Sequence, residues 1–208
     1  MRLSKIRHFL VWLCLLACAG LAACSEKIPG LPRLAAGDVV LAFGDSLTYG
    51  TGAPYQQSYP AVLSELIGHT VVSSGVPGEQ TAEGLERLPE ALDTHQPRIL
   101  LLCLGGNDML RKVDVAETEA NLRQMIDMAQ GRGIAVVLIG VPAPALFGAT
   151  AGFHETIAQD YAIAFEGDAL NEILRDNEYK SDPVHPNARG YRMLATSLAD
   201  LLKRGGAI

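Results

Sequence analysis

The chain has 208 residues with 17 basic and 23 acidic side chains, which gives a formal net charge of −6. This acidic balance argues against nucleic-acid binding, which depends on a basic surface. The length fits one domain that is large enough to bury a sizeable core, and no internal repeat or low-complexity tract divides it.

Residues 1–23 are predicted to form a targeting segment that is not part of the fold. Three basic residues open it, and the apolar run at residues 9–21 is shorter than the roughly 20 residues that a membrane span needs. The run ends in Leu-Ala-Ala-Cys, with the cysteine at Cys24, and this motif resembles the lipobox of bacterial lipoproteins. The resemblance implies cleavage before Cys24 and lipid attachment to that residue. The alternative is an ordinary secretory signal, cut at a nearby small residue, with Cys24 discarded or unmodified.

The mature chain that such cleavage would leave has 185 residues and a formal charge of −9, because the segment contains three basic and no acidic residues. Residues 24–35, which include prolines and a glycine, are predicted to form a tether, and residues 36–208 the domain. Ser25 after a lipidated cysteine implies sorting to the outer membrane. We therefore expect a lipid-anchored protein of the cell envelope that faces the periplasm, with a soluble periplasmic or secreted protein as the alternative.

Along the predicted domain, short apolar runs alternate with longer amphipathic segments. Unbroken apolar runs are typical of strands that are covered on both faces. They lie at residues 39–43, 70–73, 99–104, 135–141 and 161–165. The amphipathic segments predict helices at residues 58–67, 81–94, 115–130 and 187–203, with shorter ones around 154–160 and 167–175. This alternation predicts an α/β fold: a mainly parallel five-stranded sheet within a three-layer α/β/α sandwich.

Ser46 directly follows the first predicted strand, at the edge where parallel α/β sheets bind their ligands. A serine hydroxyl becomes a useful nucleophile when an imidazole takes its proton and a carboxylate orients that imidazole. Asp182 and His185, spaced Asp-x-x-His near the far end of the chain, provide both groups. Because position 48 is Thr, the Gly-x-Ser-x-Gly elbow of the larger α/β-hydrolase class is absent. Taken singly, these motifs are equally compatible with a turn, a helix cap and surface residues.

Motifs after the second and third predicted strands offer groups that could stabilise negative charge. Gly75 allows close approach to its backbone N–H, although a simple loop glycine is the alternative. Asn107 follows two glycines and could donate its side-chain amide to an oxyanion, although a turn is the alternative there. Asp45 and Asp108 are expected to brace loops. Cys103, within an apolar run, is expected to be a buried core residue rather than a nucleophile.

In their order along the chain, these motifs resemble the four blocks of the SGNH (GDSL-type) hydrolase family. The matching residues are Gly44-Asp45-Ser46-Leu47, Gly75, Gly105-Gly106-Asn107-Asp108 and Asp182-Pro183-Val184-His185-Pro186. The resemblance covers about residues 38–203 and points to the compact bacterial arylesterase and acyl-CoA thioesterase/lysophospholipase members. Beyond Gly75, the chain departs from the Gly-x-x-Gly-Asp-Thr-Thr-like stretch that is common in those members. The family implies the flavodoxin-like SGNH version of the α/β/α sandwich.

The resemblance assigns a role to each site residue. It implies that Ser46 is the nucleophile, His185 the general base and then acid, and Asp182 the group that orients His185. It also implies an oxyanion hole made by the backbone N–H groups of Ser46 and Gly75 and the side-chain amide of Asn107. The implied protein is a serine esterase that hydrolyses arylester, short- or medium-chain acyl ester, lysophospholipid or acyl-CoA bonds through an acyl-serine intermediate.

Two other functions stay open. A carbohydrate O-acetylesterase of envelope polysaccharide would use the same blocks, although an aromatic content of 6% favours acyl chains over sugars. A non-catalytic envelope lipoprotein would use the scaffold for binding alone. We expect no cofactor and no metal, because His69, His95 and His154 lack metal-site spacing and are expected at helix ends or in solvent. The expected partners are a small acyl-ester substrate and, through the lipid anchor, a membrane surface, with the protein a monomer.

The loop at residues 142–152 is a further open feature. It is rich in Ala, Gly and Pro and carries Leu146 and Phe147. It is expected either to form an apolar lip of an acyl pocket or to cover the core.

Overall fold

The structure is a computed structural model that describes residues 28–143 and 150–208. The predicted targeting segment, Cys24 and residues 144–149 of the open loop lie outside the described residues. None of the helices in the described ranges has the length and apolar character that a membrane crossing requires.

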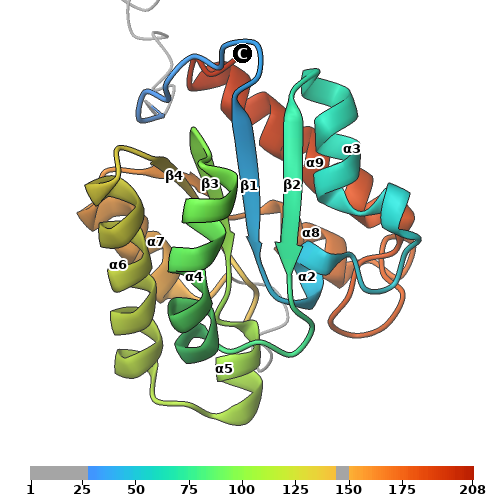
Figure 1. The fold of residues 1–208 in the computed structure, drawn as a ribbon. Helices are drawn as coiled ribbons and strands as arrows, with labels where there is room; N and C mark the ends of the chain where they lie inside the picture. The colour runs from blue at the N-terminus through green and yellow to red at the C-terminus, as the bar shows by residue number, and fades with distance from the viewer. Residues whose placement is uncertain (1–27, 144–149) are drawn as a thin grey trace, which may run out of the picture.

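Five parallel strands form one sheet in the order β2-β1-β3-β4-β5 (Figure 1). The strands are β1 (Val39–Gly44), β2 (Thr70–Gly75), β3 (Ile99–Cys103), β4 (Ala135–Ile139) and β5 (Ala164–Glu166). Each of the five apolar runs contributes a strand, which confirms the predicted parallel α/β sheet. The last strand begins later than predicted, because Tyr161 caps the preceding helix and Ala162 adopts a left-handed turn with φ 49°.

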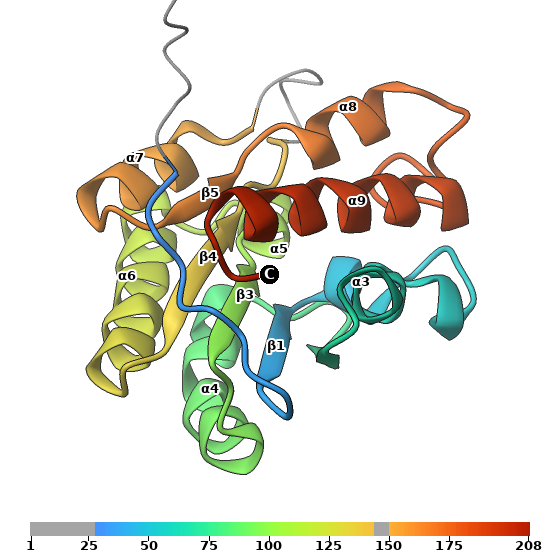
Figure 2. The same cartoon turned by 90° about the horizontal axis from the view of Figure 1, so that it is seen from above.

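Helices cover both faces of this sheet (Figure 2). One layer contains α3 (Tyr59–Ile67), α8 (Ala169–Arg175) and α9 (Ala188–Arg204), and the other contains α4 (Thr81–His95), α6 (Val115–Gly131) and α7 (Gly152–Asp160). Because side chains alternate along a strand, Val40 and Ala42 pack on the first layer, whereas Leu41 and Phe43 pack on the second. Cys103 is fully buried in the first layer, as predicted. The three-layer sandwich is therefore confirmed.

Three shorter elements complete the described chain: α2 (Ser46–Tyr49), η1 (Tyr55–Gln57) and α5 (Gly106–Arg111). The helix α5 was not predicted, since its region opens with two glycines, which are poor helix formers. Gly105 adopts a left-handed conformation with φ 107° and turns the chain from β3 directly into this helix. Asn107 therefore lies on a helix and not in a loop.

The register of the three neighbouring strands β2, β1 and β3 determines where the polar motifs meet. Gly44 of β1 lies beside Gly75 of β2 and beside Cys103 of β3. The three strands therefore end level with one another. The residues that follow them emerge at one edge of the sheet, drawn at the lower end of the strand arrows in Figure 1.

The N-terminal segment that was predicted as a tether is partly docked on the domain. The backbone N–H of Leu31 donates to the carbonyl of Gly205, and that of Leu34 donates to Ala207, both at 2.8 Å. Leu34 is also buried. This contact lies beside the C-terminus, at the opposite edge of the sheet from the polar motifs (Figure 1). Residues 31–35 thus belong to the domain and not to a free tether.

Candidate active site

Ser46 is the first residue of α2 and follows the carboxyl end of β1. Asp45 caps this short helix, because its Oδ1 accepts a hydrogen bond from the backbone N–H of Leu47 at 2.9 Å. Gly50 ends the helix in a left-handed conformation with φ 93°. The single turn therefore presents Ser46 at the edge of the sheet on a backbone that is fixed at both ends.

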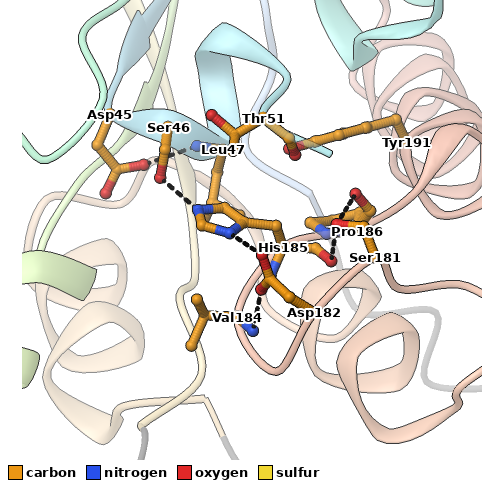
Figure 3. A network of polar contacts seen from close by, with 10 residues as sticks. All are labelled: Asp45, Ser46, Leu47, Thr51, Ser181, Asp182, Val184, His185, Pro186 and Tyr191. Atoms are coloured by element: carbon orange, nitrogen blue, oxygen red, sulfur yellow. Dashed lines mark hydrogen bonds and ion pairs between the residues drawn. The ribbon is translucent and has the colours of Figure 1, made fainter. Parts of the chain in front are cut away.

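The ring of His185 lies between Ser46 and Asp182 (Figure 3). Its Nε2 is 2.9 Å from Ser46 Oγ, and its Nδ1 is 2.8 Å from Asp182 Oδ2. Because an ionised carboxylate only accepts hydrogen bonds, Nδ1 carries the proton, which leaves Nε2 to accept from the serine hydroxyl. The fold thus brings together three residues that the sequence analysis selected, across a separation of up to 139 positions.

Asp182 is held in its ionised form. Burial raises the pKa of this carboxyl, but hydrogen bonds from the His185 ring and from the backbone N–H groups of Val184 and His185 outweigh it and hold the pKa below its ordinary value. Both backbone bonds reach Oδ1 at 2.9 Å, while Oδ2 accepts from the ring. The Asp-x-x-His spacing therefore lets one loop supply the imidazole and fix its orientation.

The loop that carries His185 is anchored at both ends. The backbone N–H of Ser181 donates to the carbonyl of His185 at 2.9 Å, which closes the loop. Asn187 follows it and caps α9 through its side chain. The hydroxyl of Tyr191 on α9 donates to the carbonyl of Thr51 at 2.8 Å and joins this helix to the segment after α2. The position of the imidazole relative to the serine therefore depends on contacts between opposite ends of the chain.

The side-chain amide of Asn107 has two acceptors. Its Nδ2 donates to Asp45 Oδ2 at 3.0 Å and to the carbonyl of Glu79 at 3.0 Å. Asn107 and Ser46 line the same cavity. The amide that the sequence analysis selected is therefore placed beside the serine, and its direction is set by two acceptors from other elements.

Gly75 ends β2 and is covered by the backbone of α2. A Cβ atom at this position would lie 2.2 Å from Tyr49 N and 2.7 Å from the carbonyl carbon of Thr48. The N–H of the next residue, Val76, donates to the carbonyl of Gly44 at 2.9 Å and extends the pairing of β2 with β1. Close packing of the strand end against α2 therefore explains the glycine at position 75 without any contact to a substrate.

A second glycine follows in a tight turn. The N–H of Glu79 donates to the carbonyl of Val76 at 3.1 Å, and Gly78 lies between them after Pro77 with φ 84°. Pro-Gly is the typical central pair of such a type II turn. The Gly78 N–H makes no backbone hydrogen bond within the described ranges, and the carbonyl of the next residue, Glu79, accepts from Asn107. Gly78 is thus another candidate backbone donor, which the sequence analysis missed although the Pro-Gly pair signals the turn.

A cavity of about 110 Å³ opens beside Ser46 and His185. Its walls are mainly apolar, and its apolar lining includes Leu47, Leu110, Val141, Pro142, Leu174 and Val184. Pro142 and Ala143 come from the open loop, and residues 144–149 lie outside the described residues. The choice between a pocket lip and a core cover therefore stays a prediction for the rest of this loop.

His154 differs from its predicted setting. It lies in α7, is fully buried, and is bonded through Nε2 to the carbonyl of Leu104 at 2.9 Å. Burial lowers its pKa to about 4, so the ring is neutral at neutral pH. His154 therefore lies near a helix end, as expected, but it is buried and not solvated, because the first turn of α7 points this residue into the core. Across the residues that the structure describes, no group of three His, Cys, Asp or Glu side chains could hold a metal ion.

Asp45 is almost fully buried, and burial raises its pKa to about 7. In the unfolded chain the same carboxyl titrates near 3.8. Between these values the folded protein binds more protons than the unfolded chain, so this group should lower the free energy of unfolding as the pH rises from about 4 to about 7. Asp45→Asn should remove this decrease in the free energy of unfolding with rising pH, as measured by urea unfolding across this pH range. Exposed Asp93→Asn is the control and should keep the wild-type slope; a wild-type slope in Asp45→Asn would contradict the prediction.

Residues 42–193 match the model of the GDSL-like lipase/acylhydrolase family. The chain is 30% identical over 179 residues to the thioesterase 1/protease 1/lysophospholipase L1 of Escherichia coli (strain K12), with 82% of this chain and 86% of that protein covered. It is 29% identical over 178 residues to an arylesterase of Vibrio mimicus, with 80% and 89% covered. A crystal structure of TesA is similar with a TM-score of 0.71 at 26% identity, and the match covers 80% of this chain and 98% of that one.

The matched range contains the turn of Ser46, the helix of Asn107 and the loop of His185. Both curated relatives are matched over most of their own length, so the similarity extends over the whole domain. The chain therefore belongs to the GDSL-like lipase/acylhydrolase family and is a serine esterase that acts on ester or thioester bonds.

Proposed function

We propose that Ser46, His185 and Asp182 form the catalytic triad of this esterase. The observation that carries the proposal is the continuous hydrogen-bonded chain from the Ser46 hydroxyl through the His185 ring to the Asp182 carboxylate, with links of 2.9 and 2.8 Å. Ser46 Oγ attacks the acyl carbon while its proton passes to His185 Nε2. The ionised Asp182 stabilises the imidazolium that forms.

The second half of the reaction uses the same groups in reverse. His185 gives its proton to the leaving oxygen or sulfur as the bond from that atom to the acyl carbon breaks, which leaves an acyl-serine. A water molecule then attacks the acyl carbon and loses a proton to His185 Nε2. Breakage of the serine ester bond returns that proton to Ser46 Oγ and releases the carboxylic acid.

The negative charge that develops on the substrate oxygen needs donors that are already in position. We assign this role to the N–H of Ser46, the side-chain amide of Asn107 and one backbone N–H from residues 75–78. Gly75 was selected from the sequence, but its conformation is explained by packing against α2. Gly78 is a second candidate, because its N–H makes no backbone hydrogen bond within the described ranges and the carbonyl of the next residue, Glu79, accepts from the Asn107 amide.

The apolar walls of the cavity support an acyl chain as the bound group. A sugar would need several polar partners, whereas the cavity offers Leu110, Val141 and Leu174 among its lining side chains. The names of the relatives, arylesterase and thioesterase/lysophospholipase, agree with acyl substrates of this kind. We therefore place short- and medium-chain acyl esters and thioesters ahead of acetylated polysaccharide.

A fluorophosphonate probe tests the nucleophile. It should label the wild-type protein at Ser46, because the activated hydroxyl attacks phosphorus as it attacks an acyl carbon, and Ser46→Ala should not be labelled. Ser64→Ala, which removes a hydroxyl bonded to the His69 carbonyl away from the site, is the control and should label like the wild type. Absent labelling of the wild type, or equal labelling of Ser46→Ala, would contradict the catalytic assignment.

A crystal structure of the labelled wild-type protein would show whether Gly78 N or Gly75 N contacts the phosphoryl oxygen.

A substrate series tests the acyl preference. Hydrolysis of p-nitrophenyl esters from acetyl to palmitoyl should be fastest at short or medium chain length, because the apolar cavity is small. Acetylated xylan and lysophospholipid should be measured beside them with the same enzyme preparation. A clear preference for the acetylated glycan would reverse the proposed order in favour of the carbohydrate O-acetylesterase.

The proposed place of action is the cell envelope, with the domain held at the outer membrane by lipid on Cys24. The motif Leu-Ala-Ala-Cys at residues 21–24 supports this proposal. Metabolic labelling with palmitate should mark the wild type and not Cys24→Ala. Cys103→Ala is the matched control and should keep the label, since that thiol is buried in the core. Label that persists in Cys24→Ala would refute lipid attachment at Cys24, and a wild type without label would favour an unmodified secretory protein.

A further inference from the structure

We infer that Arg87 and Glu79 are positioning residues, which act on the reaction by holding the side-chain amide of Asn107. The inference rests on the proposed function, in which Asn107 donates to the developing oxyanion. Neither Arg87 nor Glu79 lies in the triad or among the proposed oxyanion donors, and no part of the sequence analysis selected them.

The position of Asn107 on its helix does not by itself fix the direction of its side-chain amide. Asn107 is the second residue of a helix of six residues that opens after two glycines. Its two amide hydrogens are accepted by Asp45 Oδ2 and by the carbonyl of Glu79, each at 3.0 Å. Both hydrogens are thus taken up, and donation to an oxyanion requires the amide to exchange its bond to Asp45 for one to the substrate while the Glu79 carbonyl holds the other hydrogen.

The side chain of Glu79 is in turn held by an ion pair, while the N–H of Gln80, in the same peptide unit as the Glu79 carbonyl, donates to Glu83 at 2.9 Å. The Glu79 side chain is only 4% exposed, and its two oxygens accept from Arg87 Nε and Nη2, each at 2.7 Å. Such a two-pronged pair is the strong and directional form of an ion pair. A carboxylate this deeply buried is costly unless it keeps its partner. The pair therefore holds residue 79, and its carbonyl, in one place.

Arg87 itself is tied to the ends of two strands. It lies on α4, and its guanidinium donates to the Ser74 hydroxyl at 2.6 Å and to the Ser74 carbonyl at 3.1 Å. It also lies over the Phe43 ring, with 4.0 Å from its central carbon to the ring centroid. Contacts thus run without a break from the sheet through Arg87 and Glu79 to Asn107.

The rest of the segment between β2 and α4 is held at other points. Thr81, at the start of α4, donates its backbone N–H and its hydroxyl to Asp108. Between β2 and that anchor, Val76 and Pro77 are exposed, and the backbone hydrogen bond from Glu79 to Val76 closes the turn. Removal of the ion pair should therefore loosen the turn and the Asn107 amide while α4 and α5 keep their contact.

A double-mutant cycle tests the inference. Arg87→Met and Glu79→Gln should each lower kcat by about 10- to 100-fold, the range that displacement of a reacting group produces. KM for a short p-nitrophenyl ester should change little, because the apolar walls are untouched. Asn107→Ala alone should lower kcat by about 10²- to 10³-fold. In the Asn107→Ala variant, Arg87→Met should lower kcat by less than about a further 3-fold, since the effects of residues that act through one another are not additive. An equal loss of kcat in both backgrounds would overturn the inference.

Arg123 provides a matched control. It forms an ion pair with Asp160 at 2.7 Å and lies over the Tyr161 ring, so it makes the same two kinds of contact as Arg87. It lies on α6 and not among the residues that line the cavity. Arg123→Met should leave kcat unchanged. Arg87→Lys, which keeps the positive charge but loses the two-pronged contact with Glu79, should recover part of the kcat lost in Arg87→Met.

A second readout separates this inference from the proposed function. In isotope-labelled protein, the side-chain amide signals of Asn107 should exchange slowly with solvent, and Glu79→Gln and Arg87→Met should shift them and speed their exchange. Unchanged signals in both variants would overturn the inference even if the triad is active. If wild-type protein is not labelled by the fluorophosphonate, the proposed function fails, and the amide signals still decide whether Arg87 and Glu79 hold Asn107.

Discussion

The buried carboxylate of Asp45 is the interaction on which the rest of the site depends. One oxygen caps the turn that carries Ser46, and the other accepts from the amide of Asn107. Two helices that leave different strands, α2 after β1 and α5 after β3, are joined through this one side chain. Burial disfavours the charged form, as the raised pKa records, and the hydrogen bonds partly offset that cost while they fix the two elements relative to each other.

Other buried carboxylates also join separate elements along this edge of the sheet. Asp108 on α5 accepts from Thr81 on α4 and so joins helices that follow β3 and β2. Glu79 accepts from Arg87 and so joins the turn after β2 to α4. These groups stand on an apolar sandwich whose strands end level with one another. The turn of Ser46 and the side chain of Asn107 are therefore held in place before a substrate arrives, which is the arrangement that the proposed stabilisation of developing charge requires.

The sequence-based predictions succeeded where local patterns of residues decide the structure, and they failed where contacts between distant residues decide it. The central strands β1, β3 and β4 could be placed because burial on both faces of a parallel sheet demands unbroken apolar runs, whereas the edge strand β2 is only half-buried. The helix α5 was missed because its opening glycines argue against a helix, and a left-handed Gly105 overrides that propensity. The burial of His154 was missed because a lone histidine carries no local sign of burial. Residues 31–35 were taken for a tether because their bonds to Gly205 and Ala207 join the two ends of the chain.

By itself, the sequence determined the parallel α/β class and the presence of Ser46, Asn107 and an Asp-His pair where strands end or the last helix begins. Those features depend on residue type and on periodicity over a few residues. Only the tertiary structure decided that Ser46 and His185 meet at 2.9 Å, that Asn107 is held by the Glu79 carbonyl, and that Gly75 packs against α2. Each of these depends on strand register and on side chains from distant elements, and a hydrogen bond between residues 139 positions apart has no counterpart in any local pattern.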